Sequence, residues 1–196
     1  MKSYYKPAAA LLLLSVLSGC DNNTPLMEQV LEKNTAAVES AILESDNIDV
    51  RNNYGWTALT HAARLGHTEI MQLLIKNGAD VNTVDDTSWS PLLRAAMKGH
   101  TDAAKLLLEH GADIHHADNN GWTALHWAAQ ADNGQIMKML IDRGADLNAT
   151  TEDGWNARMV AQNEGNAELT NLINRWMKAT ETASPLDKKI YKKDDE

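Results

Sequence analysis

The 196-residue chain contains no phenylalanine and a single cysteine, Cys20. One thiol cannot form an internal disulfide, so non-covalent packing must hold the fold together. Without Phe, the apolar core must consist mostly of Leu, Ile and Ala, with large rings at few positions. Basic residues are also scarce, because 18 Lys and Arg against 27 Asp and Glu give a formal net charge of −9. Phosphate binding needs a basic face, so this balance argues against nucleic acid as the main partner.

The sequence also lacks the common catalytic motifs. It contains no Gly-x-Ser-x-Gly, no phosphate-binding Gly-rich loop and no His-Glu-x-x-His. The adjacent histidines His115 and His116 could hold a metal ion only with further ligands, and none is evident. The sequence therefore predicts a protein that is not an enzyme and that has no cofactor and no metal site.

The long apolar run of the chain lies at its N-terminus. Residues 8–17 are mostly apolar and follow two lysines, and the run is too short to span a bilayer comfortably, as is typical of an export signal. It ends in Leu17-Ser18-Gly19-Cys20, which resembles the lipobox of bacterial lipoproteins. The resemblance implies cleavage after residue 19 and attachment of diacylglycerol, and usually a further acyl chain, to Cys20. The alternative is a plain secretory signal with a chance cysteine.

The residue after the cysteine bears on the location. Asp21 resembles the signal that retains enterobacterial lipoproteins in the inner membrane. Together with the lipobox, it predicts a protein anchored by lipid on the periplasmic side of a bacterial membrane, with the inner membrane favoured.

Four tryptophans divide the rest of the chain into equal units. Trp56, Trp89, Trp122 and Trp155 stand 33 positions apart, and a Gly-Ala-Asp sequence recurs with the same step. A constant period of this length indicates one structural unit used repeatedly. The predicted units are 52–84, 85–117, 118–150 and 151–177.

Each unit predicts two short helices joined by a turn. Thr57, Ser90 and Thr123 are suited to cap the first helix, and Gly66 and Gly99 are suited to end it. Pairs of alanines follow in the first helix, where they allow the second helix to approach closely. Apolar residues at helical spacing mark the second helix. They are Ile70, Leu73, Leu74, Ala103, Leu106, Leu107, Ile136, Met139 and Leu140.

This unit resembles the ankyrin repeat, most clearly in Gly121-Trp122-Thr123-Ala124-Leu125-His126. The resemblance covers about residues 52–177. It implies an all-α ankyrin-repeat solenoid of stacked helix–turn–helix units with β-hairpin-like loops, in which neighbouring units share one core. It also implies that His67, His100 and His126 bond to backbone between units.

Several positions depart from the repeat pattern. Ser88 replaces the turn glycine of the second unit, and since Ser tolerates a positive φ poorly, we expect a distorted hairpin there. Asp132-Asn133 replaces Gly-His in the third unit, and the fourth unit lacks the Thr-x-Leu-His segment, as a C-terminal cap would. The acidic pair Asp85-Asp86 is expected to lie solvated at a hairpin tip.

The remaining segments complete the predicted organisation. Residues 1–19 are the signal peptide, 20–27 a lipidated tether, 28–51 a degenerate N-terminal capping repeat and 178–196 a charged tail. The tail is expected to be flexible, and the alternative is a clamp that uses its lysines on a partner or on anionic headgroups.

The resemblance implies a protein partner, bound by the hairpin tips and by the concave surface of the first helices. The matching positions are Trp56, Trp89, Trp122, Trp155, Arg64, Leu65, Met97, Lys98, Gln130, Ala131, Tyr54, Asp86, Thr87, Asn119 and Asn120, with Asn53, Glu152, Asp153, Asn163 and Glu164 beside them. Tryptophan is common at interface hot spots. The Trp rings could form a stacked ladder that only stabilises the hairpins, or a ladder that also contacts the partner.

The sequence therefore predicts a non-enzymatic, lipid-anchored and monomeric protein that binds another protein in the bacterial periplasm. One predicted role is that of an immunity protein that neutralises a toxic effector. The alternative is an accessory or stabilising factor for a periplasmic or envelope enzyme.

Overall fold

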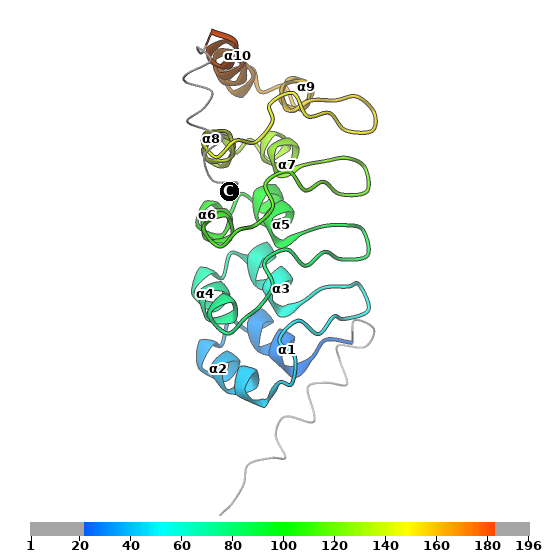
Figure 1. The fold of residues 1–196 in the computed structure, drawn as a ribbon, viewed down its shortest axis with the longest axis vertical. Helices are drawn as coiled ribbons and strands as arrows, with labels where there is room; N and C mark the ends of the chain where they lie inside the picture. The colour runs from blue at the N-terminus through cyan, green and yellow to red at the C-terminus, as the bar shows by residue number, and fades with distance from the viewer. Residues whose placement is uncertain (1–21, 183–196) are drawn as a thin grey trace, which may run out of the picture.

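The computed structural model describes residues 22–182, which form ten helices and no extended strand (Figure 1). The helices are α1 (Pro25–Leu31), α2 (Thr35–Glu44), α3 (Ala58–Leu65), α4 (Thr68–Lys76), α5 (Pro91–Lys98), α6 (Thr101–Glu109), α7 (Ala124–Gln130), α8 (Gly134–Asp142), α9 (Ala157–Asn163) and α10 (Ala167–Thr182). The predicted signal peptide, Cys20, Asp21 and the tail from residue 183 lie outside the described residues. None of the described helices is long and apolar enough to cross a membrane.

The helices stack in two parallel rows. Helices α1, α3, α5, α7 and α9 form an inner row in which each packs on the next, and α2, α4, α6 and α8 form an outer row behind it (Figure 1). The loops that precede α3, α5, α7 and α9 all project to the same side, beyond the inner row. The predicted all-α solenoid of stacked helix–turn–helix units is confirmed.

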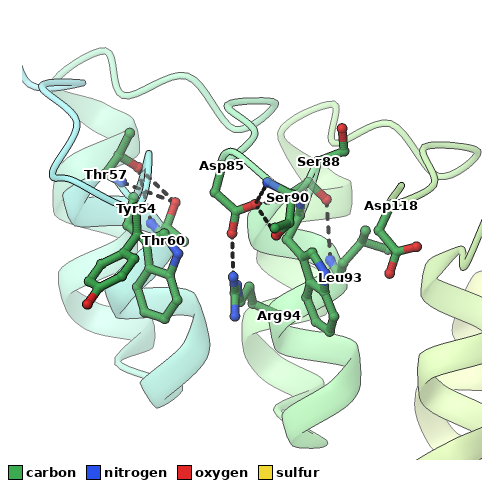
Figure 2. Close-up of polar contacts among 12 residues, drawn as sticks. Tyr54, Thr57, Thr60, Asp85, Ser88, Ser90, Leu93, Arg94 and Asp118 are labelled. Atoms are coloured by element: carbon green, nitrogen blue, oxygen red, sulfur yellow. Dashed lines mark hydrogen bonds and ion pairs between the residues drawn. The ribbon is translucent and has the colours of Figure 1, made fainter. Parts of the chain in front are cut away.

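Local sequence explains where the inner helices begin and end. The Thr57 hydroxyl accepts a hydrogen bond from the Thr60 backbone N–H at 3.2 Å, and the Ser90 hydroxyl accepts one from Leu93 at 3.3 Å (Figure 2). These bonds satisfy N–H groups that the first turn of a helix leaves free. Helices α3 and α5 end at Gly66 and Gly99, as predicted.

Small residues hold the two rows close together. The alanine pairs at 62–63, 95–96 and 128–129 are fully buried in the inner helices. In the outer helices the buried stripe includes Met71, Ala104 and Met137, which the helical spacing in the sequence did not predict. The predicted Leu73 and Met139 are partly buried instead. In α4, α6 and α8, the residue directly after the first predicted apolar residue is therefore also part of the buried stripe.

The stack begins earlier in the chain than the sequence predicts. Helix α1 starts at Pro25, after Thr24, whose side chain accepts from the Met27 N–H at 3.3 Å. Leu26 and Met27, predicted to lie in the tether, are 4% and 1% exposed. These two side chains therefore belong to the core of the stack. At the other end, α10 continues to Thr182, beyond the predicted end of the fourth unit at residue 177.

The predicted distortion at Ser88 is wrong. Ser88 adopts φ +61°, close to the +76° of Gly121 at the same position of the next hairpin. Its N–H donates to the Asp85 carbonyl at 2.9 Å, as the Gly121 N–H does to Asp118. The turn therefore keeps its shape, and the serine backbone carries the strain of a left-handed conformation.

Candidate functional site

The base of each hairpin contains a buried polar residue four positions before its tryptophan. These residues are Asn52, Asp85, Asp118 and Thr151, and none is more than 7% exposed. In the second unit the Asp85 Oδ1 accepts from the N–H groups of Thr87 at 2.9 Å and Trp89 at 3.0 Å. Such a side chain sets the turn by taking the place of a backbone acceptor.

The prediction that Asp85 and Asp86 are both solvated is therefore wrong for Asp85. Asp85 is 5% exposed, whereas Asp86 beside it is exposed. The difference arises because Asp85 directs its carboxylate to N–H groups of its own hairpin, whereas Asp86 lies on the exposed side of the tip. Sequence reasoning did not identify Asp118 as buried either, although both aspartates stand at the same step before a tryptophan.

In the second and third units, the second carboxylate oxygen of the aspartate ties the hairpin to its inner helix. Asp85 Oδ2 forms an ion pair with Arg94, which rises from α5 (Figure 2). Asp118 Oδ2 accepts from the indole Nε1–H of Trp127 at 3.1 Å. Burial alone would raise the pKa of Asp85, but hydrogen bonds from Trp89, Thr87 and Arg94 hold that pKa below its ordinary value. The hairpin and the helix are thus fixed to each other by one ionised side chain.

Arg94 and Trp127 also fill the spaces between successive tryptophans of the hairpins. The Arg94 guanidinium lies 4.2 Å from the ring centroid of Trp56 and 4.6 Å from that of Trp89. The Trp127 ring lies 4.4 Å from Trp89 and 4.5 Å from Trp122. The order Trp56, Arg94, Trp89, Trp127, Trp122 forms one continuous stack, which we call the aromatic column.

The aromatic column corrects the simple ladder that the sequence suggested. Among the described residues, the hairpin tryptophans contact side chains inserted between them rather than each other. Sequence reasoning missed Arg94 and Trp127, which both stand five residues after a tryptophan of the 33-residue period. The equal step of five residues could have indicated that the two side chains occupy equivalent places. It was overlooked because arginine and tryptophan have little in common apart from a flat polar group.

Backbone hydrogen bonds join the hairpins to one another at their tips. The Asp86 N–H donates to the Tyr54 carbonyl at 3.4 Å, the Asn119 N–H to Thr87 at 3.4 Å, and the Glu152 N–H to Asn120 at 3.0 Å. Since these bonds link all four hairpins in series, the tips form a continuous and ordered surface.

The predicted binding residues differ in exposure. Tyr54 and Trp155 are 52% and 39% exposed, and Trp56, Trp89 and Trp122 are partly buried in the aromatic column. Arg64, Leu65 and Met97 are also partly buried, and the Arg64 guanidinium lies 5.3 Å from the Trp56 ring centroid. The exposed residues are Asn53, Asp86, Thr87, Lys98, Asn119, Asn120, Gln130, Ala131, Glu152, Asp153, Asn163 and Glu164.

Several of these residues meet around an open cavity between the third and fourth units. The cavity has a volume of about 290 Å³ and is lined by Trp122, Gln130, Thr151, Asp153, Trp155, Val160, Asn163 and Glu164. A second cavity, of about 450 Å³, lies against Trp155 with Met159 and Gln162 in its lining. The C-terminal end of the inner row is therefore the hollowed part of this surface.

Histidines that the sequence predicted to bond between units have a structural role in at least two units. His100 Nε2 lies 3.1 Å from the Arg64 carbonyl oxygen. His126 Nδ1 accepts from the Thr123 N–H at 3.2 Å, so its Nε2–H donates to the carbonyls of Ala149 and Trp155, at 3.1 and 3.0 Å. The predicted bonds between units are confirmed for these two side chains. Burial lowers the pKa of His126, although the two carbonyl bonds act in the opposite direction.

The adjacent histidines do not come together with other metal ligands. His116 Nε2 lies 2.7 Å from the Ser88 carbonyl oxygen, where it supports the strained turn. Within residues 22–182, no group of three or more His, Cys, Asp or Glu side chains could hold a metal ion.

Comparison with known proteins agrees with the stacked architecture. No curated protein matches the chain. A family model described as ankyrin repeats (3 copies) matches residues 2–85 and 81–151, which is most of the sequence. The family model and the stack of helix pairs with projecting hairpins together identify the chain as a member of the ankyrin-repeat family.

Proposed function

We propose that this protein is a lipid-anchored binding module that holds a protein partner at the periplasmic side of a bacterial membrane. We propose further that it acts there as an immunity protein that neutralises a toxic effector. Ankyrin repeats are typical protein–protein interaction modules, and ankyrin-repeat proteins are generally non-enzymatic binding scaffolds.

The observation that carries the binding proposal is the ordered, exposed surface made by the hairpin tips and the C-terminal ends of the inner helices. Tyr54, Lys98 and Trp155 project from three different units of it. Because the tips are hydrogen-bonded in series, a partner meets a surface that is already ordered, and little conformational entropy is lost on binding.

The anchoring proposal rests on the sequence Leu17-Ser18-Gly19-Cys20. Four residues separate Cys20 from Pro25, the first residue of α1. A chain of that length spans at most about 18 Å. A lipid on Cys20 would therefore keep the helical stack close to the membrane, where an effector that attacks the envelope arrives.

Membrane fractionation of a Cys20→Ala variant tests the anchor. We expect the wild-type protein to incorporate labelled palmitate and to sediment with membranes, and the variant to do neither. Cys20 is the single cysteine, so no other thiol can take its place. Unchanged sedimentation of the variant would show that the lipoprotein assignment is wrong.

Capture from a solubilised envelope fraction, followed by identification of the captured protein, tests the binding role. Lys98→Glu reverses a charge on the inner row, and Lys105→Glu makes the same change on the outer helix α6. We expect the first variant to lose the partner and the second to retain it, because only Lys98 lies on the proposed surface. Equal capture by both variants would place the contact elsewhere.

The identity of the captured protein decides between the two roles. An immunity protein should protect a cell that exports the partner as a toxin, and protection should disappear in the Lys98→Glu variant. If the partner is instead an envelope enzyme whose amount falls when this protein is removed, the accessory role is correct and the immunity role is wrong.

A further inference from the structure

The aromatic column stops one unit before the hairpins do. In the second and third units, the side chain five residues after the tryptophan is Arg94 or Trp127, and an aspartate holds it. In the fourth unit Val160 occupies that position, and Thr151 occupies the position of the aspartate. Valine is too short to fill the space between two rings, and threonine cannot supply a carboxylate. The inserted group and its anchor are therefore lost together.

The missing group leaves a space in the structure. The cavity of about 290 Å³ lies between the third and fourth units, with Trp122, Trp155 and Val160 in its lining. Trp155 is 39% exposed, and no aromatic ring or guanidinium of residues 22–182 stacks on it. We call this space the Trp122–Trp155 slot, and its wall also includes Asp153 and Glu164.

The chain itself shows which group suits such a space. Arg94 lies between the rings of Trp56 and Trp89, at 4.2 and 4.6 Å from their centroids, and its charge is paired with Asp85. A planar guanidinium can stack on indole faces while its edge binds a carboxylate. The slot offers the same two features, two indoles and nearby carboxylates, and no cation of residues 22–182 lies in its lining.

We propose that the Trp122–Trp155 slot binds an arginine side chain of the protein partner, which completes the aromatic column from outside. This inference deepens the proposed binding function and rests on it. Asp153 and Glu164 select a cation over a neutral ring, because burying a ring against two carboxylates would remove water from them without compensation. The two indoles in the lining of the slot favour arginine over lysine, because a planar guanidinium can stack on them, whereas the ammonium of lysine is compact and strongly hydrated.

A peptide that needs no knowledge of the partner tests this proposal. The full chain, ¹⁵N-labelled and kept in a zwitterionic detergent, is titrated with acetyl-Gly-Arg-Gly-amide, and the indole N–H resonances are followed by NMR. We expect saturable shifts of Trp122 and Trp155 with a dissociation constant in the millimolar range. Trp56 and Trp176 serve as internal references and should stay in place. The citrulline peptide, which has the same shape without the charge, should bind at least about tenfold more weakly.

Two single substitutions and one matched control assign the binding to the slot. Trp155→Ala removes one wall, and Glu164→Gln removes a charge while leaving the shape intact. We expect each substitution to raise the dissociation constant of the arginine peptide by about fivefold or more. Met159 lines the second cavity but not the slot, and it is 41% exposed. Met159→Ala should therefore leave the affinity unchanged.

Filling the slot from within provides the strongest test. The double variant Thr151→Asp and Val160→Arg reproduces the pair formed by Asp85 and Arg94, with the same spacing of nine residues. It should fold and should no longer bind the peptide. If it loses its helical circular dichroism, the two single variants above still decide the question.

The outcomes separate the slot from the wider function. The slot assignment is wrong if the arginine peptide at about 100 mM, far above a millimolar dissociation constant, moves neither indole resonance. It is also wrong if the citrulline peptide binds equally well. Suppose that either result is obtained, while a partner is still captured and this capture is lost in the Lys98→Glu variant. The arginine-binding role of the slot would then be refuted, and the proposed function would stand. If the peptide binds but no partner is captured, the slot assignment would stand and the proposed binding function would be refuted.

Discussion

The pair formed by Asp85 and Arg94 gives the sharpest test of how the hairpins are held. The Asp85 side chain is 1% exposed and that of Arg94 is 13% exposed. Replacing Asp85 with Ala removes the acceptor for the N–H groups of Thr87 and Trp89 and leaves the guanidinium without a counterion. Removing one partner of a buried ion pair costs about 3–5 kcal/mol. Since Arg94 keeps its two indole contacts, we expect the lower end, about 3 kcal/mol.

Two control variants separate the parts of this effect. Asp85→Asn keeps an oxygen for the two hairpin N–H groups, as Asn52 does in the first unit at 3.0 Å to each of its N–H donors. It loses the charge and replaces the acceptor for Arg94 with an NH2 group, but it keeps the hairpin bonds, so we expect an intermediate destabilisation of about 1–2 kcal/mol. Asp86→Ala removes the neighbouring exposed carboxylate, and we expect a change within about 0.5 kcal/mol.

Urea denaturation followed by far-UV circular dichroism measures these free energies of unfolding. The pH dependence gives an independent check, because the pKa of Asp85 is lowered in the folded state. The stability from its ionised form is present above the unfolded pKa of about 4 and is lost as the pH falls through the lower folded value. The difference between wild type and Asp85→Asn should therefore shrink below about pH 4. A loss under about 1 kcal/mol for Asp85→Ala, or an equal loss for Asp86→Ala, would refute the reasoning.

Three further predictions concern other parts of the stack. Trp127→Ala removes the ring inserted between Trp89 and Trp122. It should lower the free energy of unfolding by about 2–3 kcal/mol in the same urea assay. A loss below about 1 kcal/mol would contradict the role of Trp127 in the aromatic column. Ser88→Gly relieves a non-glycine residue at φ +61° and should stabilise by about 0.5–1 kcal/mol, seen as a higher Tm; a lower Tm would show that the serine is unstrained. Burial lowers the pKa of His126, so its stabilising contribution is present above an unfolded pKa of about 6.5 and is lost as the pH falls through the folded value. The stability of a His126→Gln variant, measured between pH 7.5 and 5, should therefore fall less steeply than that of the wild type.

Much of the fold follows from local sequence, and the sequence alone was sufficient to predict it. The constant step between the tryptophans indicated a repeated unit, and capping residues such as Thr57 and Ser90 predicted where the inner helices begin. A cap acts on N–H groups two or three residues away, so its effect can be read along the chain. The early start of α1 at Pro25 was missed because Leu26 and Met27 are buried by other units, which no local pattern reveals.

The candidate site depended on contacts between units. Asp85 and Asp86 are identical neighbours in sequence, yet one is buried beneath the hairpin and the other is exposed. Arg94 stacks on Trp56, which belongs to the preceding unit and lies 38 positions earlier in the chain. The sequence therefore predicted that the tryptophans recur and that rings could stack.

Which side chains stand between those rings, and where the aromatic column ends, were decided by the tertiary structure. The space between two hairpins depends on the distance at which their helices pack, and on side chains supplied by different units. Val160 and Thr151 are unremarkable residues in the sequence, and they line a cavity only because the third and fourth units bring them together with Trp122 and Trp155. The sequence by itself determined the repeated unit, because helix caps and spacing act over a few residues, whereas the open slot exists only where two units meet.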